Sequence, residues 1–136
     1  MVSFRCYDPS SDGNGGIHSW YNSLPISFRA EVDAVIELLA LENNLREIPE
    51  VKALRGACEG LTEIKVDFAL KEKKKERQIH LRILGFDGPA KDEFTLLTGF
   101  EKVSHNATYG PYCRSALKRK CGVIRDARKA KPCCFP

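Results

Sequence analysis

The chain of 136 residues contains no apolar run long enough to span a bilayer, which takes about 20 consecutive apolar residues. The first residues, MVSFRC, also lack the apolar segment of a secretory signal. We therefore expect a cytoplasmic protein without a membrane partner. With 43% hydrophobic and 29% charged residues, the composition excludes collagen-like and fully disordered chains. It fits one domain over residues 1–136, with 131–136 as a loose tail.

Motifs for metal and cofactor chemistry are missing as well. There is no C-x-x-C pair, no Cys/His group with zinc-ligand spacing, no serine triad and no nucleotide-binding glycine loop. We expect neither metal nor cofactor, and in a cytoplasmic protein we expect reduced thiols. Cys113 and Cys121, eight residues apart, are interpreted as half-buried thiols of one helix. The six cysteines stand at 6, 58, 113, 121, 133 and 134.

Basic residues are scarce in the first part of the chain. Residues 1–51 carry three Lys/Arg and eight Asp/Glu, a balance of −5, whereas residues 52–136 carry nineteen and ten, a balance of +9. This asymmetry indicates a surface for a polyanion in the second part, with a merely solubilising surface as the alternative.

The first part of the chain is predicted to be mainly helical. A short strand is expected over 2–7 and a loop over 8–16. Apolar residues at three-and-four spacing then predict a helix over 26–42, and Pro49 and Gly56 frame a shorter helix over 50–55.

Alternation follows over 61–68, 77–86 and 94–100, predicting an antiparallel meander with a charged turn at 70–76. A closing helix is expected over 112–129, its inner stripe formed by Ala116, Leu117, Cys121 and Ile124. The fold class is α+β, a small antiparallel sheet with two N-terminal helices and a C-terminal helix.

One face of this sheet carries the residues that could perform chemistry. Cations stabilise charge in phosphodiester cleavage, a general base activates the attacking hydroxyl, and RNA supplies its own 2′-hydroxyl nucleophile. Tyrosines can stack on a splayed base. The alternative is an ordinary solvated face of a one-sided sheet. The residues concerned are Glu63, Lys65, Asp67, His80 and Arg82, followed by Lys102, Tyr109 and Tyr112.

The hairpin tip is a second candidate surface, with a plain solvated turn as its alternative. Its cations could contact RNA phosphates without sequence preference. The RNA-binding candidates are Lys71, Lys73, Lys74, Lys75 and Arg77, together with Tyr112.

Four segments in order resemble RelE/HigB-like toxins of type II toxin–antitoxin systems, in particular the phage-derived HigB-like branch. PEVKAL followed by GLTEIK resembles the family's K-x-L…G-L-x-E-[LI]-[RK], and HLRIL its Y-R-[IV]-x-[YF] strand. LLTGFEK resembles L-L-H-G-F-x-K-K, and SALKR the A-x-x-R start of the closing helix. The resemblance covers roughly residues 20–125.

The resemblance implies a RelE/ParE-like domain that cleaves mRNA in the ribosomal A site without a metal, restrained by a cognate antitoxin, often a helix-turn-helix protein. Lys65 matches the basic residue of the first sheet strand and Arg82 the arginine that stabilises the transition state. Lys102 matches the basic residue after the last strand, and Tyr109 or Tyr112 the aromatic that stacks on the target base.

Some positions depart from the family pattern and leave two questions open. Val103 replaces the family's second lysine, and His80 and Leu81 stand where an aromatic precedes the strand arginine. The general base and the stacking tyrosine are therefore not assigned. The leading hypothesis is a ribosome-dependent mRNA endoribonuclease. The alternatives are a ParE-like gyrase inhibitor and a non-catalytic RNA- or protein-binding module of the same fold.

Overall fold

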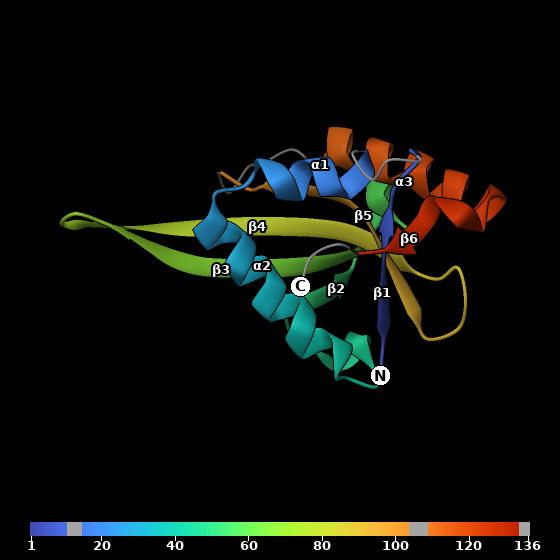
Figure 1. The fold of residues 1–136 in the computed structure, drawn as a ribbon, viewed down its shortest axis with the longest axis horizontal. Coiled ribbons are helices and arrows are strands. Elements are labelled where there is room, and N and C mark those ends of the chain that lie inside the picture. The colour runs from blue at the N-terminus through green and yellow to red at the C-terminus, as the bar shows by residue number, and fades with distance from the viewer. Residues whose placement is uncertain (11–14, 104–108, 134–136) are drawn as a thin grey trace.

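A computed structural model describes residues 1–10, 15–103 and 109–133. Within these ranges the protein is α+β, with six strands in one sheet in the order β2-β3-β4-β5-β1-β6 (Figure 1). The strands are β1 (Ser3–Tyr7), β2 (Val51–Ala53), β3 (Thr62–Glu72), β4 (Lys75–Asp87), β5 (Glu93–Glu101) and β6 (Ala130–Pro132). The helices are α1 (Gly16–Ser23), α2 (Ile26–Ala40) and α3 (Gly110–Arg125), with short 3-10 turns η1 (Leu45–Glu47), η2 (Gly56–Cys58) and η3 (Ala127–Lys129).

The predicted meander is confirmed. β3, β4 and β5 pair antiparallel in succession, and Lys65 lies opposite Arg82 in the β3–β4 register. β1 joins the other side of β5 in parallel, which brings the first strand of the chain into the sheet beside the last strand of the meander. The β3–β4 hairpin extends well beyond its neighbours as a two-stranded arm (Figure 1).

The two faces of the sheet are buried under different helices. α2 packs against β3 and β1, and its Phe28, Val32 and Ile36 share one core with the odd-numbered apolar residues of β4 and with α1. α3 packs Cys113 and Ala116 onto the opposite face, over Leu84, Phe86, Leu97 and Phe100. His80 and Arg82 share this second face because strand side chains alternate.

The predicted helix over 50–55 is wrong. Val51–Ala53 forms β2, paired antiparallel with Thr62–Ile64, and only 3-10 turns flank it. A three-residue strand has no period of its own, so only its partner β3 defines it. A helix that was not predicted, α1, follows the glycine-rich stretch and buries Ile17 and Tyr21. Residues 11–14 of the predicted loop lie outside the described residues.

The predicted inner stripe of the closing helix is wrong in part. α3 ends at Arg125 and buries Cys113, Ala116 and Val123, whereas Cys121 is exposed and Ile124 is 64% exposed. The contact of Cys113 with η2 determines which side of α3 faces the sheet. The buried residues are those that lie on the same side of the helix as Cys113.

Residues 131–133 are not part of a loose tail, contrary to the expectation. Ala130–Pro132 pairs antiparallel with β1 as β6, and only residues 134–136 lie outside the described part of the chain.

The expectation of reduced thiols is also wrong in this structure. Disulfides join Cys6 to Cys133 and Cys58 to Cys113, and Cys121 is the free cysteine among the described residues. Sequence spacing does not reveal pairs separated by 127 and 55 residues, because only the pairing of β1 with β6 and the packing of α3 on η2 bring these cysteines together.

Candidate functional site

The four predicted catalytic residues gather on the α3 face of the sheet. Lys65 and Arg82 are cross-strand neighbours on β3 and β4. Lys102 follows β5, and its backbone N–H donates to the carbonyl of His80 at 2.7 Å. Tyr109 caps the start of α3, and the Lys102 ammonium lies 5.9 Å from the centre of its ring. The site is therefore assembled from β3, β4, the residue after β5 and the N-terminal end of α3.

Arg82 is a buried cation at the centre of this site, only 6% exposed. Its Nη1 donates to Asp67 Oδ1 at 2.6 Å and to the carbonyl of Leu81 at 2.9 Å. Its Nε lies 3.7 Å from Glu63 Oε1 and makes no hydrogen bond to any described residue. Burial alone lowers the pKa of Arg82, but hydrogen bonding and charge from Asp67 outweigh it and raise the pKa. The guanidinium is therefore fixed in its charged form.

Asp67 joins Arg82 to His80. The same Oδ1 that accepts from Arg82 lies 2.9 Å from Nδ1 of His80. Partial burial raises the pKa of Asp67, but hydrogen bonds from Arg82 and His80 more than offset this and hold it below its usual value. Asp67 is thus an ionised acceptor near neutral pH.

Tyr109 closes the site on the helix side. Burial, followed by hydrogen bonding to the Glu63 carboxylate, raises the pKa of Tyr109 to about 12, although Arg82 acts in the opposite direction. Its phenol therefore keeps its proton at physiological pH. Glu63, only 3% exposed, is held between Tyr109 and Arg82 and belongs to the wall of the site.

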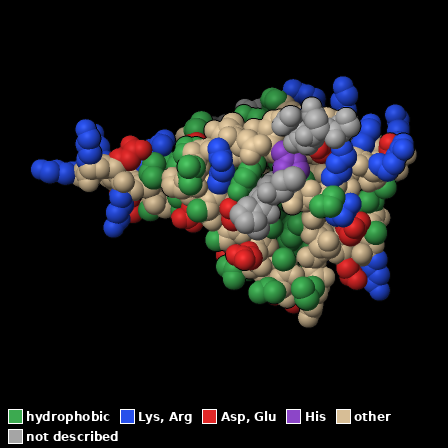
Figure 2. All heavy atoms as spheres, in the orientation of Figure 1, with side chains coloured by type: hydrophobic (Ala, Val, Ile, Leu, Met, Phe, Trp, Pro, Cys, Tyr) green, Lys and Arg blue, Asp and Glu red, His purple; other side chains and the backbone are tan. Residues whose placement is uncertain are grey.

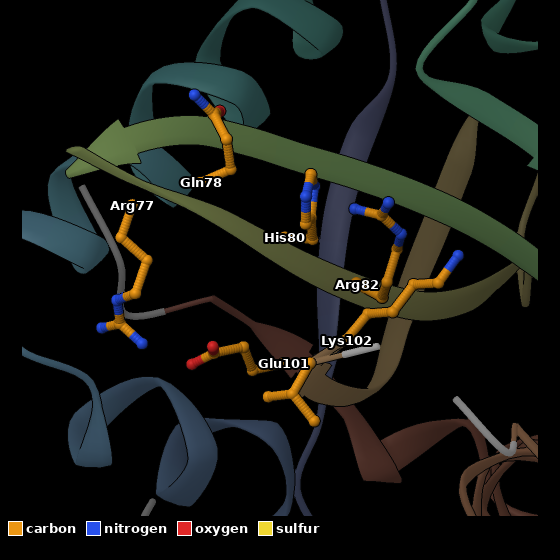
Figure 3. A pocket seen from close by; sticks show the side chains of 7 residues that line it. Arg77, Gln78, His80, Arg82, Glu101 and Lys102 are labelled. Atoms are coloured by element: carbon orange, nitrogen blue, oxygen red, sulfur yellow. The ribbon is translucent and has the colours of Figure 1, made fainter. Parts of the chain in front are cut away.

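An open cavity of about 400 Å³ lies beside these residues. Figure 3 shows His80 and Arg82 of β4 and Lys102 after β5 projecting to one side, whereas Arg77 and Glu101 project to the other. Cations predominate in the lining, which contains Arg77, Arg82 and Lys102 and the single carboxylate of Glu101. A polyanion such as a nucleic-acid backbone would find complementary charge here.

Most of the predicted RNA-binding residues lie away from the cavity. Figure 2 shows Lys and Arg side chains gathered at the tip of the β3–β4 arm. Of these residues, Arg77 alone lines the cavity within the described chain. The exposed cations of the arm are Lys71, Lys73, Lys74, Lys75 and Arg77.

Tyr112 occupies a different place from Tyr109. Its ring stacks on Phe100 with centroids 4.1 Å apart and planes 3° apart, and the residue is 40% exposed. Tyr109 instead meets Phe100 edge to face and hydrogen-bonds within the site. Tyr112 is therefore the more accessible surface for a stacked base.

The sequence placed His80 and Asp67 on the correct face but gave neither a role. Their pairing depends on the β3–β4 register, in which the two residues are directly opposite. Alternation alone marks a face, whereas register identifies partners. The sequence could have predicted this register if the hairpin turn had been placed at residues 73–74, because the position of the turn determines which residues lie opposite each other.

Comparisons with known proteins place the chain in no group. No family model matches it, and neither the curated proteins nor the solved structures contain a match. Among the described residues, no helix is long and apolar enough to cross a membrane, and no group of three His, Cys, Asp or Glu could hold a metal ion.

Proposed function

We propose that this protein is the toxin of a toxin–antitoxin pair and cleaves mRNA on the ribosome without a metal. The proposal includes a RelE/ParE-like arrangement of the fold and a HigB-like ancestry. It is supported by the ordered sequence segments and by one structural observation: Lys65, Arg82, Lys102 and Tyr109 lie together, and Arg82 and Lys102 line an open cationic cavity. No other described part of the chain combines a buried cation with such a cavity.

The chemistry of the site suits RNA more than other polyanions. Attack by the 2′-hydroxyl on the adjacent phosphate needs charge stabilisation at the phosphorus and proton transfer. Arg82, kept charged by Asp67, and Lys102, beside the cavity, supply the first requirement. Tyr112, stacked on Phe100, offers a surface for a neighbouring base.

Two further elements belong to the same proposal. A cognate antitoxin, often a helix-turn-helix protein in this family, would restrain the toxin. The protein would act in the cytoplasm, where ribosomes are. A reducing cytoplasm disfavours disulfides, so the proposal requires the fold to persist with the four paired thiols reduced.

The decisive experiment is inducible expression in bacteria, with primer extension on a reporter mRNA. Wild type should arrest growth and produce cuts in translated mRNA. Lys65→Ala should remove both effects, because it deletes a cation that forms no ion pair with any described residue and leaves the buried Arg82 network in place. Arg82→Lys tests the guanidinium separately, because it keeps the charge and removes the planar group. Lys91→Ala, an exposed change in the β4–β5 loop, is the matched control.

The alternatives give different results in the same cells. Growth arrest with intact mRNA and DNA-damage signalling would identify a gyrase inhibitor. No growth effect would favour a binding module. Equal toxicity of a folded Lys65→Ala/Arg82→Lys variant would contradict the nuclease.

A further inference from the structure

We propose that His80, oriented by Asp67, is the general base of the cleavage step. This inference rests on the proposed function and assigns the proton-transfer group that the resemblance leaves open. The observation behind it is the 2.9 Å contact between His80 Nδ1 and Asp67 Oδ1 beside the cavity.

The contact fixes the form of the imidazole. The Asp67 carboxylate is ionised and only accepts hydrogen bonds, so Nδ1 of His80 carries a proton and donates it. In the neutral ring Nε2 then holds the lone pair. Arg82 anchors the same Oδ1 and, being buried, prevents the carboxylate from moving away. The dyad is therefore oriented before substrate arrives.

The position of His80 suits proton abstraction. Its side chain is 43% exposed and lines the cavity next to Arg82 and Lys102, the two cations proposed to hold the phosphate. Other candidates are less suitable. Glu63 is buried between Arg82 and Tyr109, and the phenol of Tyr109, with a pKa of about 12, is a poor base near neutral pH.

The step balances without a co-reactant. His80 Nε2 takes the proton of the 2′-hydroxyl while the 2′-oxygen forms a bond to phosphorus. The bond from phosphorus to the 5′-oxygen breaks, and that oxygen keeps the electron pair and takes a proton from water. His80 then returns its proton to water. The products are a 2′,3′-cyclic phosphate and a 5′-hydroxyl end.

Single-turnover cleavage on purified ribosomes programmed with mRNA tests the assignment. His80→Ala should slow cleavage about 100- to 10,000-fold, the usual loss of a general base. Added imidazole should restore part of the rate of His80→Ala but not of Lys65→Ala. Lys91→Ala is the control, because Lys91 is exposed in the β4–β5 loop outside this cavity and its change should leave the rate within threefold.

The pH profile separates a base from a structural residue. With His80 as the base, the wild-type rate should rise with pH along a limb that His80→Ala loses. The charged groups around His80 are Asp67 on β3, Arg77 and Arg82 on β4, and Glu101 and Lys102 at the end of β5. Asp67→Asn should lower the rate because it no longer fixes the Nδ1–H form.

The outcomes distinguish the two proposals. If wild type cleaves and folded His80→Ala retains its rate and pH limb, the dyad is wrong and the nuclease stands. If wild type leaves ribosome-bound mRNA intact, the nuclease fails, and the dyad fails with it.

Discussion

The charge of Arg82 is already shared within the protein before any substrate arrives. Asp67 holds Nη1 at 2.6 Å, and Glu63 lies near Nε. Substitution of Arg82 by a neutral residue should destabilise the fold, because removing one partner of a buried ion pair leaves an uncompensated charge. This explains why Lys65, rather than Arg82, is the cleaner position at which to test the site.

Individual residues were predicted best where alternation alone decides their position. The assignment of Lys65, His80 and Arg82 to one face is confirmed, with Ile79, Leu81 and Ile83 buried on the other. Their burial was not predictable, because α3 covers only part of the face: Arg82 is buried while His80 stays partly exposed. The alternation of residues along β4 does not indicate how much of its face is covered by α3, a helix distant in the sequence.

Gly99 is a residue whose size the packing dictates. A Cβ built there would lie 2.3 Å from the indole of Trp20, so α1 rests directly on the β5 backbone. Gly99→Ala should lower the free energy of unfolding by about 1–3 kcal/mol through overpacking, measured by urea denaturation.

Gly122 provides the matched control. It lies inside α3, where a Cβ would meet only the Lys129 side chain at 3.7 Å. Gly122→Ala should therefore stabilise by about 0.5–1 kcal/mol, because alanine loses less conformational entropy in a helix. Equal effects of the two alanines would contradict the tight Trp20 packing.

At the level of elements, long periodic segments were predicted well and short ones poorly. The three meander strands and the helix beginning at residue 26 carry their own period, and the structure confirms them. β2 and β6 are three residues each and exist because a neighbouring strand pairs with them. Elements defined by a partner rather than by a pattern need the tertiary structure.

The β3–β4 arm is an element without a packed partner at its tip. Its cross-strand pairs Lys71–Glu76 and Glu72–Lys75 are exposed, so they contribute little stability. The arm is therefore free to use its cations on an external polyanion.

Neutralising the tip should weaken RNA binding without unfolding the protein. We expect the combined change Lys71→Gln, Lys74→Gln and Lys75→Gln to reduce the slope of log affinity against log salt by up to about 2, near 0.7 per lost phosphate contact. Fluorescence anisotropy with single-stranded RNA at several salt concentrations measures this slope. Lys91→Gln is the control away from the arm, and an unchanged slope in the triple variant would show that the tip is only a solvated turn.

At the scale of the molecule, the charge asymmetry of the sequence has a spatial counterpart. α2 lies on the sheet face opposite the candidate site and exposes Glu31 and Glu37 together with Glu42 just beyond its end. The cations of the site and of the arm come from the second part of the chain. The acidic part would thus face away from RNA, which lowers repulsion during association.

The two disulfides connect distant parts of this molecule. Cys6–Cys133 fastens β1 to the residue after β6, and Cys58–Cys113 fastens η2 to the first turn of α3, one turn beyond Tyr109. The second bond therefore holds the helix end that closes the candidate site. The thiol state of these four cysteines sets both the stability of the fold and the compartment in which it can work.

Reduction should destabilise the protein by an amount that loop size predicts. Closing a loop of 55 residues stabilises by about 4 kcal/mol in the chain-entropy model, so Cys58→Ala/Cys113→Ala should lower Tm by roughly 10–15 °C. Cys121→Ala, at the exposed free thiol, should leave Tm unchanged. Thermal melts with and without dithiothreitol, combined with thiol titration of the native protein, measure both. A reduced protein that stays folded above 37 °C is what a cytoplasmic toxin requires, and one already unfolded at that temperature would instead place its activity in an oxidising compartment and contradict a ribosomal target.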